Sequence, residues 1–133
     1  MKKLLTYSVL VLIMFSCAKY EDGPEFSLLS RKRRIVNNWQ LVMIENTVTE
    51  AKWDTSLSKV VWGFEETGAF WKSDNSTGIW EFLDELTLKI SYDNEQEYMD
   101  SIEIFIISRL ASKELWLKEQ DVAEPLKYQF SPV

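Results

Sequence analysis

The chain has 133 residues and a formal net charge of −6, and it contains no histidine. A chain of this length predicts a single domain, and its acidic balance argues against a nucleic-acid partner, whose phosphates would repel it. Histidine is the commonest general base and the commonest metal ligand, so we expect neither a metal site nor a histidine-activated nucleophile. Six Trp, with only four Gly and three Pro, indicate a folded chain rather than a low-complexity one.

Residues 1–16 resemble the signal peptide of a bacterial lipoprotein. Lys2 and Lys3 form a basic head, an apolar run of roughly a dozen residues follows, and Ser16-Cys17 stands at the cleavage position. The run is too short for a membrane-spanning helix, which needs about 20 apolar residues. Cys17 is the only cysteine, and acylation would remove a free thiol that has no disulfide partner. We expect a lipid on Cys17; the alternatives are an ordinary signal peptide with a buried cysteine, or an N-terminal core helix.

The segment 17–27 is interpreted as the acylated cysteine and a tether, which leaves 28–133 as the folded domain. The tether is polar and contains a Gly-Pro breaker. Its acidic pair, Glu21 and Asp22, resembles the export tag of surface lipoproteins in some Gram-negative bacteria. The alternative is a solvated linker, and both interpretations stay open on the sequence alone.

Residues 27–38 predict a short helix capped by Ser27 or Ser30. The helix carries the only strongly basic run of the chain, at 31–34. Such a run could contact a phosphate or a lipid headgroup. A solvated helix face beside an acidic body is the simpler interpretation, and we favour it.

The rest of the chain predicts about eight short strands joined mostly by hairpin-length loops. The expected strands cover residues 39–49, 59–65, 69–72, 77–82, 86–91, 99–110, 114–118 and 126–130. Residues 52–56 are predicted to be a connection. The strand at 99–110 is apolar on both faces near 104–107, which indicates either a covered central strand or a bulge.

No segment between these strands is long and periodic enough to form a crossover helix, so the sheet is predicted to be antiparallel. The pattern favours an all-β fold, either an up-and-down barrel or a sandwich, after one short N-terminal helix. A barrel of about eight strands can close around side chains or around one small ligand.

Aromatic residues supply the candidate binding site. Five of them are predicted to share the inward face of the strands: Trp39, Trp62, Phe64, Trp80 and Phe82. They would form either a packed core or an apolar cavity for a lipid or similar small molecule. Trp53 and Trp71 are predicted to lie on loops or outer faces, where they could mark a protein contact or a surface that stacks on sugar.

Catalytic chemistry is not indicated. Carboxylates cluster at 65–66, 84–85 and 93–97, but all three clusters lie in predicted turns. A glycosidase needs two carboxyl groups that face each other across a cleft, so we expect no catalytic residues and no enzyme. Asp93, Glu95 and Glu97 alternate and could ligate calcium, yet they lack the glycine and the bidentate pattern of a calcium loop. We favour a solvated hairpin there and expect no metal or cofactor.

Four pieces of the chain together resemble the small lipocalin-like lipoproteins of Gram-negative bacteria. They are YEDGPEFSL at 20–28, the basic helix running into NW at 38–39, TGIWEF at 77–82 followed by LTLKI at 86–90, and IISRL at 106–110 followed by ELWL at 114–117. The resemblance implies a meandering, calycin-type barrel with a Trp near the start of its first strand, closed at one end by the N-terminal helix. Lipocalins place a Gly two residues before that Trp, where this chain has Asn37. They also pack a late Arg on the Trp, and Arg109 or Lys127 is the candidate for that role.

Two functions are consistent with these features. The first is a lipid-anchored envelope lipoprotein, exported to the outer membrane of a Gram-negative bacterium on its periplasmic or outer side, that binds a small apolar ligand in its barrel. The second is a non-enzymatic structural or interaction component of an envelope protein complex that acts through its outer surface. A roomy interior would favour the first function, whereas a solid core with an exposed Trp53 or Trp71 would favour the second.

Overall fold

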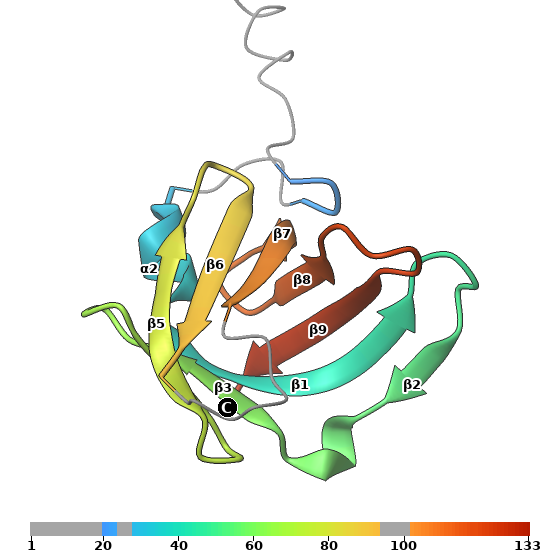
Figure 1. Cartoon of the computed structure of the whole chain (residues 1–133), viewed down its shortest axis with the longest axis horizontal. Helices are drawn as coiled ribbons and strands as arrows, with labels where there is room; N and C mark the ends of the chain where they lie inside the picture. The colour runs from blue at the N-terminus through green and yellow to red at the C-terminus, as the bar shows by residue number, and fades with distance from the viewer. Residues whose placement is uncertain (1–19, 24–27, 94–101) are drawn as a thin grey trace, which may run out of the picture.

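The computed structural model describes residues 20–23, 28–93 and 102–133. Within these residues, nine antiparallel strands form one sheet, preceded by a short helix (Figure 1). The elements are α2 (Arg31–Ile35), β1 (Asn37–Asn46), β2 (Lys52–Asp54), the 3-10 turn η1 (Ser56–Ser58), β3 (Val61–Phe64), β4 (Ala69–Lys72), β5 (Thr77–Phe82), β6 (Thr87–Tyr92), β7 (Ile102–Leu110), β8 (Leu115–Glu119) and β9 (Leu126–Pro132).

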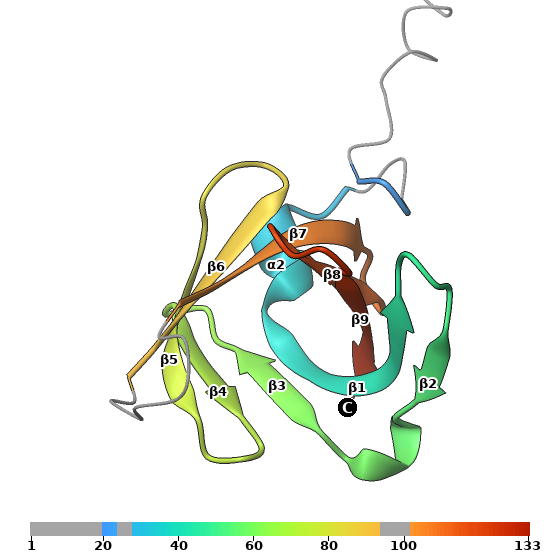
Figure 2. The same cartoon turned by 45° about the vertical axis from the view of Figure 1, so that its right-hand side comes forward.

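The sheet closes into a barrel because β1 pairs with both β3 and β9. The strand order is β2-β1-β3-β4-β5-β6-β7-β8-β9, with the additional pairing β1–β9. Eight strands therefore form the wall, while β2 lies outside it on the far half of β1. The ten residues of β1 make this possible: its first half pairs with β3 and its second half with β2, and its other edge pairs with β9. Figure 2 shows β1 curving along the wall. The predicted all-β, up-and-down antiparallel barrel is confirmed.

Alternation along the strands places the core inside the barrel, as the period-2 pattern requires. On β6, for example, Leu88 and Ile90 are buried between residues that are partly exposed. The buried apolar residues form one cluster: Tyr20, Ile35, Trp39, Leu41, Trp62, Phe64, Phe70, Trp80, Leu88, Ile90, Phe105, Ile107, Leu110, Leu115, Leu117 and Phe130.

The N-terminal helix is shorter than the predicted 27–38, since α2 spans only Arg31–Ile35. Ser30 caps it by accepting a hydrogen bond from the Arg33 amide. The helix ends where the chain must turn into β1, and the Trp39 indole then donates to the Ile35 carbonyl at 2.8 Å. Both residues are fully buried, so α2 closes this end of the barrel. In the described part of the chain, no helix has the length and apolar character needed to cross a membrane.

The solvated face favoured for residues 31–34 is wrong for two of the four. Arg34 is buried and donates to the Leu110 carbonyl, and Arg31 lies over the Phe82 ring at 4.2 Å from its centroid. Lys32 and Arg33 are exposed. A five-residue helix turns its side chains in all directions, so a continuous basic run cannot stay on one face.

Two strand predictions need correction or refinement. Residues 52–56 are not only a connection, because Lys52–Asp54 pairs with β1 as the exposed strand β2. On β7, the register shifts between Ile107 and Arg109, which confirms the bulge rather than a strand covered on both faces. Ile102 and Ile104 are exposed at the start of that strand. The predicted beginning of the strand at 99–101 lies outside the described residues.

Residues 20–23, which were interpreted as tether, pack against the barrel. Tyr20 is buried, Glu21 pairs with Lys118 and Asp22 pairs with Lys127. A solvated linker therefore does not describe the acidic pair in this structure, whereas the export tag stays a prediction. The signal peptide at 1–16 and the lipid expected on Cys17 lie outside the described residues and stay predictions.

Candidate functional site

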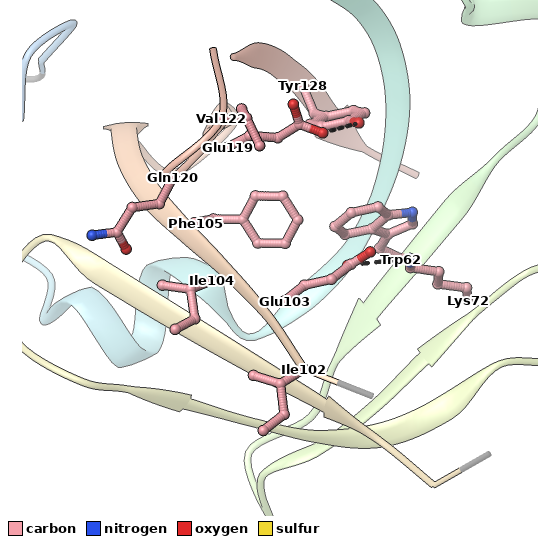
Figure 3. A pocket seen from close by; sticks show the side chains of 10 residues that line it. All are labelled: Trp62, Lys72, Ile102, Glu103, Ile104, Phe105, Glu119, Gln120, Val122 and Tyr128. Carbon is pink, nitrogen blue, oxygen red and sulfur yellow. Dashed lines mark hydrogen bonds and ion pairs between the residues drawn. The ribbon is translucent and has the colours of Figure 1, made fainter. Parts of the chain in front are cut away.

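A cavity of about 430 Å³ opens at the end of the barrel opposite α2. The two ends follow from β7, whose first residues line the cavity while its last residue, Leu110, accepts the hydrogen bond from Arg34. A volume of this order lies within the range of small-molecule pockets. Figure 3 shows the residues that line it: Trp62, Lys72, Ile102, Glu103, Ile104, Phe105, Glu119, Gln120, Val122 and Tyr128.

The floor of the cavity is aromatic. The Trp62 ring from β3 lies 5.9 Å from the Phe105 ring and 6.0 Å from the Tyr128 ring, measured between centroids. Figure 3 shows Phe105 pointing toward Trp62. Deeper in the barrel, Phe130 packs on Trp62 at 4.9 Å, which fills the space below. These contacts give the cavity a rigid apolar base.

Lys72 brings a cation into this aromatic site. It lies opposite Trp62 in the β3–β4 register, and its Nζ is 4.2 Å from the Trp62 ring and 4.8 Å from the Tyr92 ring. Glu103 Oε2 is 3.7 Å from the same Nζ. Burial lowers the pKa of Lys72, and the Glu103 charge only partly opposes this effect. The ammonium is held by ring faces and one carboxylate, with little solvent.

Two tyrosine–carboxylate pairs complete the polar groups. The Tyr92 hydroxyl donates to Glu103 at 2.6 Å, and the Tyr128 hydroxyl donates to Glu119 at 3.0 Å. Burial, together with the neighbouring carboxylates, raises the pKa of both hydroxyls well above their ordinary value. They therefore remain neutral hydrogen-bond donors at any physiological pH. The arrangement can hold an apolar body on the rings and position a polar group at Lys72.

All five sequence-predicted aromatic residues point inward, but only Trp62 lines the cavity at the open end. Trp39 and Phe64 are fully packed, and Trp80 donates from its indole to the Glu65 carbonyl at 2.9 Å. Phe64 lies 5.8 Å from Trp80, and Trp80 lies 5.4 Å from Phe82. These rings fill the closed half of the barrel, and a second hollow of about 430 Å³ lies outside them beside α2, lined by Ser30, Lys32, Arg33, Val36 and Glu66.

Trp80 and Phe82 also border a smaller recess of about 220 Å³ on the side of α2. Lys32 and Glu66 are among the residues around it. The recess is shallow and open to solvent, and we assign it no function.

Sequence reasoning missed the polar members of the site, which are Lys72, Glu103 and Glu119. A signal for Lys72 was present, because it stands two residues after inward-facing Phe70 on the strand that pairs with Trp62. Tyr128 was predicted to alternate with Phe130, but it was not placed at a site. Charged residues on a strand are normally predicted to face solvent, so this rule misses a lysine such as Lys72 that faces aromatic rings.

The outer aromatic residues differ in exposure. Trp53 on β2 is 49% exposed. Trp71 is half-buried, because its ring lies flat over Gly63, where an added Cβ would come within 2.1 Å of the ring. Arg109 and Lys127 both lie over Trp116, at 5.5 and 5.6 Å, rather than over Trp39 as the resemblance implied.

In residues 20–23, 28–93 and 102–133, no group of three or more His, Cys, Asp or Glu side chains could hold a metal ion. The calcium alternative rests mainly on Glu95 and Glu97, which lie outside the described residues.

Comparison with solved structures identifies the fold. The structure of a lipocalin-like protein from Bacteroides uniformis matches with a TM-score of 0.58 at 14% identity, covering 75% of this chain and 99% of that one. An uncharacterized protein from Bacteroides eggerthii matches with a TM-score of 0.52 at 15% identity, covering 74% and 99%. No protein-family model and no curated protein matches the sequence. At this identity the likeness shows the fold alone, which is a lipocalin-like barrel.

Proposed function

We propose that this protein is a lipid-anchored lipoprotein whose lipocalin-like barrel binds a small, largely apolar ligand in the cavity at its open end. The aromatic floor formed by Trp62, Phe105 and Tyr128, with the Lys72 ammonium held against it, carries this proposal. Such a site combines aromatic ring faces with a few placed polar groups, namely Lys72, Glu103 and Glu119, which is the usual composition of small-molecule pockets. The ligand has an apolar body and a polar or anionic group that replaces part of the Lys72–Glu103 contact.

The anchor and the location belong to the same proposal. The signal-like segment ending at Cys17 supports export and acylation, and stable anchoring requires more than one acyl chain. Both similar solved structures come from Bacteroides species. The location that we propose is the outer membrane of a Gram-negative bacterium. We propose no enzymatic activity and no cofactor.

The test uses residues 18–133 and two measurements. Native mass spectrometry after mild purification records small molecules that co-purify with the barrel. A fluorescence titration with 1-anilinonaphthalene-8-sulfonate then measures binding of a probe that has an apolar body and one negative charge. Wild-type protein is expected to bind the probe with a single saturable site.

Matched variants locate the binding. Trp62→Leu and Lys72→Met change the cavity, whereas Trp71→Leu and Lys89→Met change the same residue types outside it. We expect about tenfold weaker probe binding for each cavity variant and little change for the other two. Equal binding by all five proteins, with no co-purifying mass, would overturn the proposal.

A second candidate function is an interaction component of an envelope complex, and the exposed Trp53 favours it. Large exposed aromatic residues are enriched at protein interfaces. A photo-crosslinking amino acid at position 53, compared with one at Leu57 on the neighbouring turn η1, tests this function in intact cells. A discrete adduct at position 53 alone would favour the interaction role, and equal labelling at both positions would exclude a specific contact at Trp53.

A further inference from the structure

Residues 20–23 are fastened to the barrel by their backbone. The Asp22 amide donates to the Ser108 carbonyl at 2.7 Å, and the Leu110 amide donates to the Gly23 carbonyl at 3.3 Å. The Arg109 guanidinium donates to the Asp22 carbonyl at 2.6 Å. The segment is therefore held along the end of β7 that lies next to α2.

Side chains hold the same segment. Tyr20 is 1% exposed and packs under the Arg34 guanidinium, 5.6 Å from its ring centroid. Asp22 accepts from the Ser108 hydroxyl and pairs with Lys127 at 2.9 Å. Glu21 pairs with Lys118 on β8. These contacts join the segment to β7, β8, β9 and α2, so its position on the barrel is defined.

The proposed lipid lies close to this fastening in sequence. Cys17 precedes Tyr20 by three residues, and three residues of extended chain span about 10 Å at most. A lipid on Cys17 would thus hold the barrel near the membrane and would allow few orientations. A free tether over 17–27 would have allowed many more.

The end of the barrel that this attachment brings to the membrane exposes apolar and basic side chains. We call it the anchor face and define it by Leu28, Lys32, Arg33, Leu83 and Leu86, all exposed. The start of α2 and the β5–β6 turn are adjacent, because Arg31 donates to the Asp84 carbonyl between the two turn leucines. Figure 1 shows the β5–β6 turn and residues 20–23 at the top of the view, with α2 beside β5 below them.

We propose that the anchor face rests on an anionic lipid bilayer and that the cavity opens on the opposite side, toward water; this rests on the lipid attachment in the proposed function. The leucines enter the headgroup layer, and Lys32 and Arg33 meet negatively charged headgroups. Asp84 and Glu85 share the turn with the leucines, and Glu66 borders the same hollow as Lys32 and Arg33, so apolar contact contributes more than net charge. A ligand accordingly enters from the aqueous side and not from the membrane.

Two leucines with nearly equal exposure provide a matched test. Leu28 on the anchor face is 91% exposed, and Leu57 on η1, near the far half of β1, is 94% exposed. Each is replaced by cysteine in the full chain, and the lipoprotein is purified, labelled with an environment-sensitive fluorophore and reconstituted in vesicles of phosphatidylethanolamine and phosphatidylglycerol. An acylated Cys17 does not react with the label.

Spin-labelled lipids then quench each fluorophore according to its depth. We expect quenching about threefold stronger at Leu28→Cys than at Leu57→Cys, with a blue-shifted emission at the first position only. Equal quenching, or stronger quenching at Leu57→Cys, would overturn the orientation. Ile102→Cys at the rim of the cavity, at the opposite end of β7 from Leu110, serves as a second far-side position and is expected to match Leu57→Cys.

Acylation of Cys17 is measured independently of the orientation of the barrel. The mass of the N-terminal peptide and flotation of the protein with the vesicles report acylation at Cys17. An acylated, floating protein with equal quenching at both positions would remove the orientation and leave the proposed anchor intact. An unmodified N-terminus that does not float would remove both.

Discussion

Lys72 and Trp62 face each other across the β3–β4 pair, with the ammonium 4.2 Å from the centre of the indole ring. The contact places a cation inside the mouth of a barrel whose other inward residues are mostly apolar. A cation over a ring face is stabilised by the ring quadrupole, most strongly where water is scarce. The open end of the barrel therefore contains a charged side chain among its rings, whereas the end closed by α2 is filled with packed apolar side chains.

The position of Lys72 predicts how binding of an anionic probe depends on pH. Burial lowers the pKa of Lys72 in the folded protein, so this lysine loses its charge at a lower pH than an exposed lysine does. Binding of 1-anilinonaphthalene-8-sulfonate should therefore weaken as pH rises through that lowered pKa. Fluorescence titrations between neutral and alkaline pH measure the effect, and Lys72→Met should bind weakly with no such transition. A transition that survives in Lys72→Met would assign it to another group.

Replacing Gly63 or Gly78 by alanine is expected to lower the free energy of unfolding by different amounts. A Cβ at Gly63 would meet the Trp71 side chain, whereas a Cβ at Gly78 would come within 2.1 Å of the Ser91 backbone carbonyl. Gly63→Ala should lower the free energy of unfolding by about 1–3 kcal/mol, because the Trp71 ring must move. Gly78→Ala should cost more, since the β5–β6 ladder itself must shift.

Urea unfolding of single and double variants checks this difference. Trp71→Ala should relieve most of the cost of Gly63→Ala and none of the cost of Gly78→Ala. Additive costs in the Gly63→Ala, Trp71→Ala double variant would show that the ring is not what excludes a side chain at position 63.

Trp39 and Trp53 offer a second matched comparison. Trp39 is fully buried and its indole donates to the Ile35 carbonyl, whereas Trp53 is 49% exposed on β2. Trp39→Phe should lower the free energy of unfolding by about 2–4 kcal/mol, through lost volume and an unsatisfied carbonyl. Trp53→Phe should change it by no more than about 0.5 kcal/mol. Similar shifts of the urea midpoint in the two variants would contradict the assigned roles.

The strand pattern could be predicted because its signal is local. Trp62 and Phe64 alternate within four residues, and the structure places both side chains inside the barrel. Closure of the barrel has no local signal: Leu41 pairs with Phe130, far along the chain. The eight-strand count and the resemblance favoured closure, but the pattern alone was equally compatible with a sandwich.

The candidate site was predicted only in part, for two physical reasons. The inward aromatic residues pack on one another in the closed half, so a face rich in Trp and Phe does not by itself indicate a cavity. The polar residues at the open end depend on partners on other strands, such as Lys72 on β4 with Glu103 on β7 and Tyr128 on β9 with Glu119 on β8. The attachment of residues 20–23 could not be predicted for the same reason, since Tyr20 contacts Arg34 on α2 and Asp22 and Gly23 bond to β7.

The ionisation of Asp22 predicts how the contacts between residues 20–23 and the barrel depend on pH. Burial alone would raise the pKa of Asp22, but hydrogen bonds from Ser108 and Lys127 outweigh burial, so the net pKa is lowered. A lowered pKa in the folded state gives stability that is complete above the ordinary aspartate pKa and is lost as pH falls through the folded value. The segment should therefore loosen below about pH 4.

Hydrogen exchange of the Asp22 amide, which donates to Ser108, measures this loosening directly. Asp22→Asn should show fast exchange already at neutral pH, because it removes the charge that Lys127 pairs with. Glu21→Gln is the control: its pair with Lys118 involves a mostly exposed carboxylate, and such pairs contribute little. Protection of the Asp22 amide that persists unchanged in Asp22→Asn would show that the backbone contacts with Ser108 and Leu110 hold the segment without the ion pair.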